Sequence, residues 1–315
     1  MREYMIRRLL LVPLTLLIVS FAVFSLTRLI PGDIVDIMFE EKGYAKDMDE
    51  MREKLGLNKP IYVQYFSWIG GILTGDWGES LHSRDPVLRE IGRRWPVTLQ
   101  LGLTAMVIAL LMGLPIGIFS AMRQDTAKDY ILRSYSITML SIPAFWMAIM
   151  IILVPTLWWE GWKAAPAYVH FTDNPLVSIR NTIIPAFCMG AAMSGTSMRM
   201  TRTMMLEVLR QDYIRTAWAK GLRERVIIPR HAVKNALIPV VTLIGTQMMI
   251  MVGGSVIIEQ IFGLPGLGRH MFYSITQRDY PMVSGINLVM ASAVVFINLI
   301  VDLSYAYLDP RIRYR

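Results

Sequence analysis

The chain has 315 residues, of which 54% are hydrophobic and only 18% are charged, and its mean hydropathy is +0.43. Soluble domains are about 45–50% apolar and about 25% charged, so this composition excludes an ordinary soluble protein. The net charge is +8 at pH 7. The basic residues flank long apolar runs instead of forming a separate domain, which argues against nucleic-acid binding. The lone Cys188 and four scattered histidines predict neither disulfides nor a metal site.

Six apolar runs are long enough to cross the hydrocarbon core of a bilayer, which is about 30 Å thick. The predicted spans cover residues 9–30, 98–121, 135–157, 181–198, 237–258 and 283–306. The first run follows Arg7 and Arg8 and is similar in outline to a secretory signal. Its apolar part exceeds the usual length of about 7–15 residues, and no small-residue cleavage site follows it. We therefore expect an uncleaved first helix.

The charges of the connecting segments predict the topology. Residues 31–97 carry more acidic than basic side chains, and residues 158–180 are rich in tryptophan, whereas 122–134, 199–236 and 307–315 are basic. Short basic segments stay in the cytoplasm, and tryptophans gather at membrane interfaces. The chain is therefore predicted to be an all-α integral membrane protein with six transmembrane helices and both termini in the cytoplasm.

This topology divides the chain into four parts. Residues 1–30 form the cytoplasmic N-terminus and first transmembrane helix, and residues 31–97 form an extracytoplasmic segment. Residues 98–306 form a five-helix transmembrane core that contains the cytoplasmic loop 199–236. Residues 307–315 form a cytoplasmic tail.

The fourth and fifth spans differ in composition from the others. The fourth, 181–198, is rich in Gly, Ala, Ser and Thr, which let helix backbones approach closely, so we expect it at the centre of the bundle. The fifth contains Gly253 and Gly254 shortly before IFGLPGLG, which predicts a broken helix and a re-entrant or tight outer loop. Gly253, Gly254 and Glu259, at the outer rim, are the candidate outer-gate residues.

Ionisable residues are nearly absent from the spans. Asp302 lies near the cytoplasmic end of the sixth span, and Glu259 lies at the rim of the fifth. Ion-coupled carriers generally need charges near the midplane, so secondary transport is disfavoured. No Ser/His/Asp arrangement supports an intramembrane enzyme, and no G-x-x-x-x-G-K-[ST] motif occurs, so any nucleotide energy must come from another chain. A stand-alone channel or secondary carrier remains the alternative function.

The basic segment 199–236 is the most informative part of the chain. A helical run is followed by Gly221 and a second helical stretch, and the apolar residues resume at Ala236. One interpretation is a positive loop that only fixes topology. The internal helical pattern favours the other interpretation, a docking element for a cytoplasmic partner.

This segment resembles the cytoplasmic "EAA" loop of ABC-importer permeases, in the variant of the dipeptide/oligopeptide/nickel family. The resemblance rests on Arg215-Thr216-Ala217, on Gly221 and on the RHA-x-x-NAL-x-P run from Arg230 to Pro239. It covers nearly the whole chain, because further similar segments lie at 28–33, 55–80, 96–121, 141–146 and 253–281. Trp218 and Pro229 depart from the family pattern, which bears on the docking geometry.

The resemblance implies a type I ABC-importer permease fold and one half of a two-permease pore in the inner or plasma membrane. The implied partners are a homologous second permease, two cytoplasmic ATPase subunits that hold ATP and Mg, an extracytoplasmic binding protein and the lipid bilayer. This chain would be neither an enzyme nor a cofactor-binding subunit. Peptides are the expected cargo, and nickel, glutathione or oligosaccharide remain open because specificity rests mainly with the binding protein.

Two further sets of residues complete the predicted sites. The resemblance assigns ATPase coupling to Asp212, Tyr213, Arg215, Thr216, Ala217, Lys220, Gly221 and Arg230. The pore-lining candidates, on spans three to five, are Ser141, Phe145, Met193 and Met248. The methionines of these spans either fill the core and face lipid or form a flexible lining for varied cargo.

Overall fold

The structure is a computed structural model that describes residues 2–28, 58–162 and 167–308. These residues form helices joined by turns, with no strand among them, so the predicted all-α architecture is confirmed. The α-helices are α1 (Arg2–Arg28), α4 (Ile61–Thr74), α5 (Val87–Met122), α6 (Ala127–Ser141), α7 (Ala144–Thr156), α8 (Pro175–Leu209), α9 (Asp212–Ala219), α10 (Glu224–Ile227), α11 (Lys234–Phe262), α12 (Leu267–Thr276) and α13 (Tyr280–Leu308). A π-helical turn, η2 (Ile228–Val233), joins α10 to α11.

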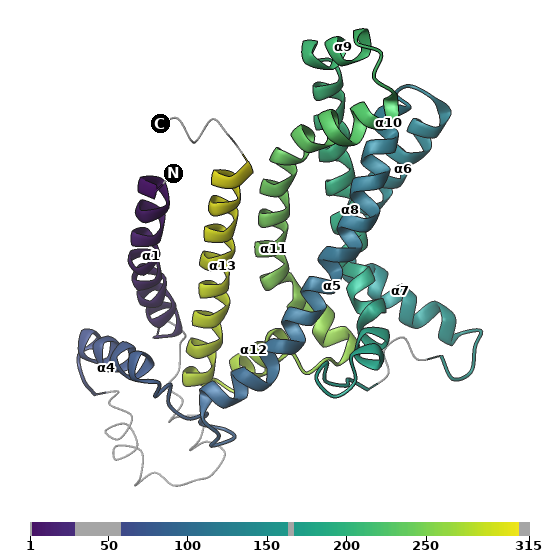
Figure 1. The fold of residues 1–315 in the computed structure, drawn as a ribbon. Coiled ribbons are helices and arrows are strands. Elements are labelled where there is room, and N and C mark those ends of the chain that lie inside the picture. Colours follow the sequence, from purple (N-terminus) through teal and green to yellow (C-terminus); the bar gives the residue numbers. More distant parts are fainter. Residues whose placement is uncertain (1, 29–57, 163–166, 309–315) are drawn as a thin grey trace.

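The long apolar helices agree with the predicted spans. Five are long and apolar enough to cross a membrane, and the bent pair α6 and α7 makes a sixth. Figure 1 shows the start of α1 and the end of α13 at the same end of the bundle as α9 and α10. That end is the one assigned to the cytoplasm by the basic segments. The predicted tail at 307–315 lies almost wholly outside the described residues, as does the outer stretch 29–57.

The third span differs from the predicted continuous helix over 135–157. It consists of two helices, α6 and α7, whose axes meet at 92°. The break lies at Ile142 and Pro143, where Ile142 adopts an extended conformation (φ −87°, ψ 115°). A residue before proline is pushed out of the helical region, and proline has no N–H to continue the ladder. The apolar run thus continues in sequence while its direction changes.

The helix α8 lies at the centre of the bundle, as its small residues predicted. It packs against α5, α6, α7 and α11. A Cβ atom at Gly190 of α8 would lie 2.6 Å from the carbonyl oxygen of Ala105 of α5, and one at Gly117 of α5 would lie 2.7 Å from that of Met198 of α8. Side chains at these positions would force the two helices apart.

The predicted break in the fifth span at Gly253 and Gly254 is wrong. The helix α11 continues through both residues and ends only at Gly263, whose φ of 66° is left-handed. Glycine lowers helix stability but keeps the backbone hydrogen bonds of the helix. The expected tight outer loop is present, because only residues 263–266 separate α11 from α12.

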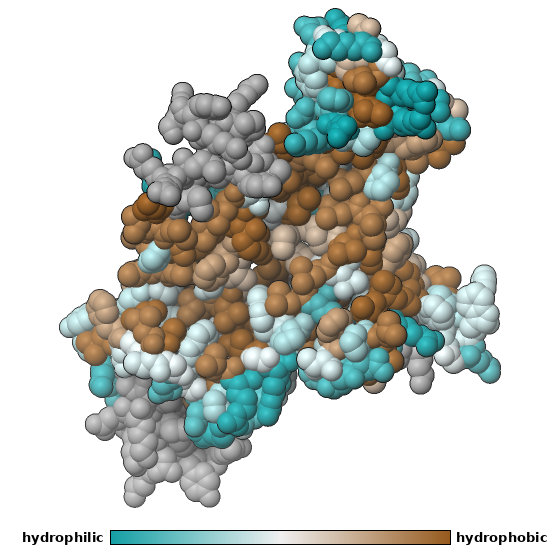
Figure 2. Space-filling model, viewed as in Figure 1, coloured by the Kyte–Doolittle hydropathy of each residue, from teal (hydrophilic) through white to brown (hydrophobic). Residues whose placement is uncertain are grey.

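On the face shown in Figure 2, a hydrophobic belt crosses the bundle between two hydrophilic ends. Large apolar side chains of the spanning helices, such as Leu10 of α1 and Ile300 of α13, are exposed, as expected where lipid replaces water. The helices α1 and α13 pack side by side, and Arg8 forms an ion pair with Asp302 at 2.9 Å. The charge of Asp302 is therefore paired near the cytoplasmic end.

Candidate functional site

The cytoplasmic knob, which comprises α9, residues 220–223 and α10, lies at the tip of the cytoplasmic end (Figure 1). The helix α9 has an amphipathic sequence, with Asp212 in its first turn, where a negative charge favours the helix dipole. The chain reverses at Gly221, whose φ is 76°. The Gly221 N–H donates to the Trp218 carbonyl at 2.9 Å and the Leu222 N–H to that of Ala217 at 3.3 Å. Glycine is favoured at Gly221 because other residues are strained in this conformation.

The inner face of the knob is packed onto the transmembrane helices. Ile214 of α9 is fully buried, and Ala217 is nearly so. The buried residues of this core come from α5, α8, the knob, η2 and α11: Ala121, Met205, Ile214, Ala217, Ile227, Ile228, Ala232 and Ala236. Close packing of this kind resists deformation. The knob is thus attached to three spanning helices.

The outer face of the knob carries most of the predicted coupling residues. The exposed ones on the knob are Asp212, Tyr213, Arg215, Thr216, Lys220 and Gly221, and Arg230 is exposed on η2, next to the knob. Tyr213 also accepts a hydrogen bond from Asn235 at 2.9 Å, whereas Ala217 lies inside the knob core. Two apolar side chains, Trp218 and Leu222, are 45% and 38% exposed beside these polar groups. The surface thus combines basic residues with an apolar tip.

A buried ion pair lies directly beneath the knob, and the sequence analysis missed it. Arg202 of α8 donates from Nε and Nη2 to the two carboxylate oxygens of Asp129 of α6, at 2.9 and 2.7 Å. Ser120 of α5 donates to the same carboxylate and accepts from Arg202 Nε at 3.1 Å. The Asp129 side chain is fully buried. We call Ser120, Asp129 and Arg202 the Asp129–Arg202 cluster.

The membrane hollow is a cavity of about 320 Å³ between the start of α7, the middle of α8 and the middle of α11. Its lining is apolar and rich in methionine, with a few polar side chains: Ala144, Met189, Ala192, Met193, Thr196, Leu243, Thr246, Gln247, Ile250, Met251 and Gly254. No lining side chain is charged. Of the pore-lining candidates, Met193 is in this set, whereas Ser141, Phe145 and Met248 are not.

Gln247 gives the hollow a fixed polar group. Its amide donates to the Met193 carbonyl at 2.9 Å, and its oxygen accepts from Ser197 at 3.2 Å. Both bonds tie α11 to α8. Gln247 could have been found from the sequence, because it is an amide in the middle of an apolar helix and a buried polar group needs hydrogen-bond partners.

At the outer end, the carboxylate of Glu259 is fully buried at the turn between α11 and α12. It accepts hydrogen bonds from the hydroxyl of Thr98 of α5 at 2.8 Å and from the backbone N–H of Arg269 at 2.9 Å. The second bond satisfies a donor in the first turn of α12. Cβ atoms at Gly266 and Gly268 would meet this carboxylate. The GLPGLG sequence is therefore explained by the close approach of the turn to Glu259.

The other two outer-gate candidates have different surroundings. Gly253 and Gly254 lie inside α11, and a Cβ atom at either would meet nothing within 4 Å. Gly254 lines the membrane hollow. The structure therefore does not bring the two glycines into contact with Glu259 at one site.

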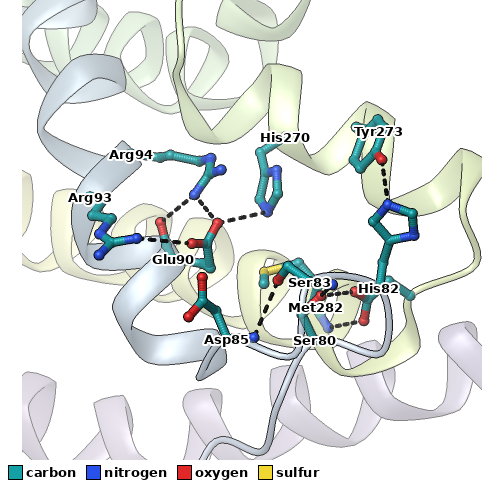
Figure 3. Close-up of polar contacts among 11 residues, drawn as sticks. Ser80, His82, Ser83, Asp85, Glu90, Arg93, Arg94, His270, Tyr273 and Met282 are labelled. Carbon is teal, nitrogen blue, oxygen red and sulfur yellow. Dashed lines mark hydrogen bonds and ion pairs between the residues drawn. The ribbon is translucent and has the colours of Figure 1, made fainter.

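A second polar cluster lies where the start of α5 meets α12 (Figure 3). Glu90 forms ion pairs with Arg94 and, at 3.4 Å, with Arg93. His270 of α12 lies 3.8 Å from the Glu90 carboxylate. Burial and the positive charge of Arg94 lower the pKa of His270 from 6.5 to about 4, although Glu90 and Asp279 act in the opposite direction. The ring is therefore neutral at physiological pH.

The sequence of the chain matches two families over nearly its full length. Residues 113–314 match the family described as "Binding-protein-dependent transport system inner membrane component", and residues 1–102 match the corresponding N-terminal family. The dipeptide transport system permease protein DppB of Alkalihalophilus pseudofirmus is 39% identical, and that of Escherichia coli K12 is 36% identical. The oligopeptide transport system permease protein AppB of Bacillus subtilis is 39% identical. In each case all of both chains is covered.

Two solved structures share the fold. A chain of the MetNI methionine ABC transporter, in inward-facing conformations, superimposes with a TM-score of 0.54 at 17% identity. It covers 70% of this chain and 96% of its own. A chain of an amino acid ABC transporter gives a TM-score of 0.51 at 15% identity and covers 71% of this chain and 94% of its own.

Proposed function

The chain belongs to the family of binding-protein-dependent transport system inner membrane components, and from that premise we propose that it forms one half of a peptide translocation pathway. It is a multi-pass inner-membrane permease subunit of an ABC importer, with the type I fold. ATP hydrolysis belongs to a separate subunit. The alternative, a stand-alone channel or secondary carrier, is disfavoured, because the family is described by binding-protein-dependent transport and the similar solved structures are chains of ABC transporters.

The observation that carries the proposal is the two-faced cytoplasmic knob. Its inner face is fixed to three spanning helices through the core around Ile214. Its outer face presents Arg215 and Lys220 with an apolar tip at Trp218. A rigid projection with exposed aromatic and arginine residues suits an interface with a protein partner. We assign this face to the ATPase.

The complete transporter, in this proposal, contains two permeases, two ATPases and one binding protein. The membrane hollow lies on α7, α8 and α11, and a homologous second permease would face it and close the pathway. ATP and Mg would be bound by the ATPase subunits. The α11–α12 turn held by Glu259 would form the outer gate, without Gly253 and Gly254, which lie elsewhere on α11.

Peptide cargo is supported by two observations. Relatives at 36–39% identity that match this chain end to end are named for dipeptide or oligopeptide transport. The hollow has methionine, threonine and glutamine side chains and no charged ones. Methionine adapts its shape to varied neighbours, and a neutral lining would bind a zwitterionic peptide weakly and release it.

The test uses the whole transporter in lipid vesicles with a labelled dipeptide. Wild-type complexes should accumulate it only with ATP and the binding protein present. Arg215→Glu reverses a charge whose side chain is 74% exposed, so the permease should still insert but lose its ATPases on purification. Arg84→Glu, at an exposed position of the outer end, is the matched control and should retain them.

Two results would contradict the proposal. Normal ATPase retention and uptake in the Arg215→Glu complex would remove the knob as the docking site. Accumulation of nickel, glutathione or an oligosaccharide in place of the dipeptide would contradict the peptide cargo but not the assignment as a permease.

A further inference from the structure

The Asp129–Arg202 cluster joins three helices at one point. Asp129 lies in the first turn of α6, Arg202 near the end of α8 and Ser120 near the end of α5. Both Asp129 oxygens are used, since the second also accepts from the Asp125 N–H at 3.0 Å. Two parallel bonds from one guanidinium fix the orientation of the carboxylate as well as its distance.

The cost of burial makes stability a poor explanation for this cluster. The Asp129 side chain is fully buried, and that of Arg202 is 16% exposed. Replacing a buried ion pair by apolar side chains of similar volume is often neutral or stabilising. Apolar residues would thus hold these helices together as well, but without a fixed relative orientation. The geometry therefore points to a role in orientation.

The cluster lies between the knob and the hollow. Its Ser120 adjoins Ala121, and its Arg202 lies one turn before Met205, and both neighbours belong to the knob core. In the other direction, α6 leads through the bend at Pro143 to Ala144, which lines the hollow.

Two hydrogen bonds continue the attachment of α6 along α8. The Tyr135 hydroxyl bonds to that of Ser194 at 2.9 Å, and the Ser136 hydroxyl donates to the Gly195 carbonyl at 2.8 Å. These bonds hold α6 against α8 independently of the ion pair. Loss of the ion pair alone should therefore change the orientation of α6 without detaching it.

We propose that Asp129 and Arg202 are positioning residues of the transport cycle, which make α5, α6 and α8 move as one body when the knob moves. The inference rests on the proposed ATPase docking at the knob. Movement of the knob then reaches the wall of the hollow through α6 and the Pro143 bend. Neither residue touches the cargo or the ATPase.

The test measures coupling in reconstituted complete transporters. The double variant Asp129→Leu with Arg202→Met removes both charges together. It should assemble, hydrolyse ATP in the absence of binding protein within twofold of wild type, and lose at least fivefold of the stimulation of ATP hydrolysis by the dipeptide-loaded binding protein. Dipeptide uptake per ATP should fall in parallel. A double variant that assembles and shows wild-type stimulation would overturn the inference.

The matched control removes a different ion pair near the cytoplasmic end, Arg8–Asp302, through Arg8→Met with Asp302→Leu. This pair joins α1 to α13, away from the knob core, so stimulation should stay within twofold of wild type. An equal loss in both double variants would also overturn the inference, because the effect would then be a general response to a lost charge pair.

A milder variant decides the matter if the double variant does not assemble. Arg202→Lys keeps the charge and loses the two-bond geometry, and stimulation should fall at least twofold. Unchanged stimulation in this variant would overturn the inference. Failure of the proposed function is seen separately, as normal ATPase retention in Arg215→Glu.

Discussion

Asp129 at the cytoplasmic end of the bundle and Glu259 at the outer end are both buried carboxylates, and their hydrogen-bond partners differ in kind. At the cytoplasmic end, Asp129 is paired with the full charge of Arg202 across separate helices. At the outer end, Glu259 is held by a backbone N–H and the Thr98 hydroxyl, at a turn whose glycines leave it room. The first arrangement fixes the relative orientation of long helices. The second shapes one short turn. The difference suggests that the cytoplasmic end transmits movement and the outer end closes a path.

The largest expected effect comes from the core of the knob. Ile214→Asp would bury an unpaired charge at a fully buried position, which costs about 3 kcal/mol or more. The knob should unfold locally while the spans still insert, so ATPase retention and uptake should be lost. Thr203→Asp, at an exposed position of α8, is the control and should retain both. ATPase co-purification and trypsin cleavage between residues 210 and 230 are the measurements, and a protected, ATPase-bound Ile214→Asp complex would contradict the packed-knob description.

At the outer end, substitutions of two glycines by alanine should change stability in opposite directions. Gly266→Ala would place a methyl group against the Glu259 carboxylate, and overpacking of this kind costs about 1–3 kcal/mol. Gly253→Ala adds a methyl group in open space inside α11, and should stabilise the helix by about 0.5–1 kcal/mol. Thermal unfolding of the purified complexes measures both. Equal unfolding temperatures for the two variants would show that the turn does not need glycine at 266.

A smaller effect at the outer end is the pH dependence of stability that comes from His270. The pKa of His270 is about 4 in the folded chain and about 6.5 when unfolded. Between these values the unfolded chain binds more protons, so stability falls as pH falls from 6.5 towards 4. The folded state should lose about 2 kcal/mol between pH 8 and pH 5 through this residue.

His270→Gln removes the pH-dependent contribution of His270 to stability. The control, His170→Gln, is at an exposed position and leaves that contribution in place. The loss of unfolding temperature between pH 8 and pH 5 should therefore be smaller in His270→Gln than in wild type, and unchanged in His170→Gln. The prediction is wrong if all three proteins lose the same amount.

The smallest expected effect is a difference in thiol-labelling rate, which tests whether the membrane hollow is part of the transport pathway. In a Cys188→Ala chain, cysteine at Met193 should react with a water-soluble thiol reagent at a rate that changes with nucleotide state, because Met193 lines the hollow. Cysteine at Met248, on α11 but outside the lining, is the matched position and should react more slowly. The sequence-based candidates Ser141 and Phe145 also lie outside the lining and should resemble Met248. Equal rates at 193 and 248 would remove the hollow as the pathway.

Much of the fold was predictable because the bilayer imposes simple rules. Apolar length identified α1, α5, α8, α11 and α13. The positions of the basic segments predicted that α1 begins and α13 ends at the same end of the bundle as the knob. The helix–turn–helix form of the knob was readable from Gly221. The bend at Pro143 was signalled by the residue pair Ile142-Pro143, but the apolar run across it concealed the change of direction. At Gly253 and Gly254 a break was predicted where the helix is continuous. Paired glycines are tolerated there because the backbone hydrogen bonds of the helix are kept.

The candidate site was less predictable, because it depends on contacts between distant helices. Arg202 was one of many basic residues, and Asp129 was one of two acids in the basic loop 122–134. Only the packing of α5, α6 and α8 brings them together. The face of a helix that lines the hollow is equally hard to predict. The sequence made both Met193 and Met248 pore-lining candidates, whereas in the structure only Met193 of the two lines the hollow.

Site-specific photo-crosslinking in the assembled transporter measures directly whether the knob contacts an ATPase. A photoreactive probe is attached to cysteine at Trp218 or, as the control, at Trp159, in a Cys188→Ala chain. Trp218 is exposed at the tip of the knob, and Trp159 is exposed beyond α7, in the segment assigned to the outer interface. The account predicts covalent products with an ATPase subunit from position 218 and none from position 159. ATPase products from position 159, or none from position 218 in a complex that hydrolyses ATP and transports, would contradict it.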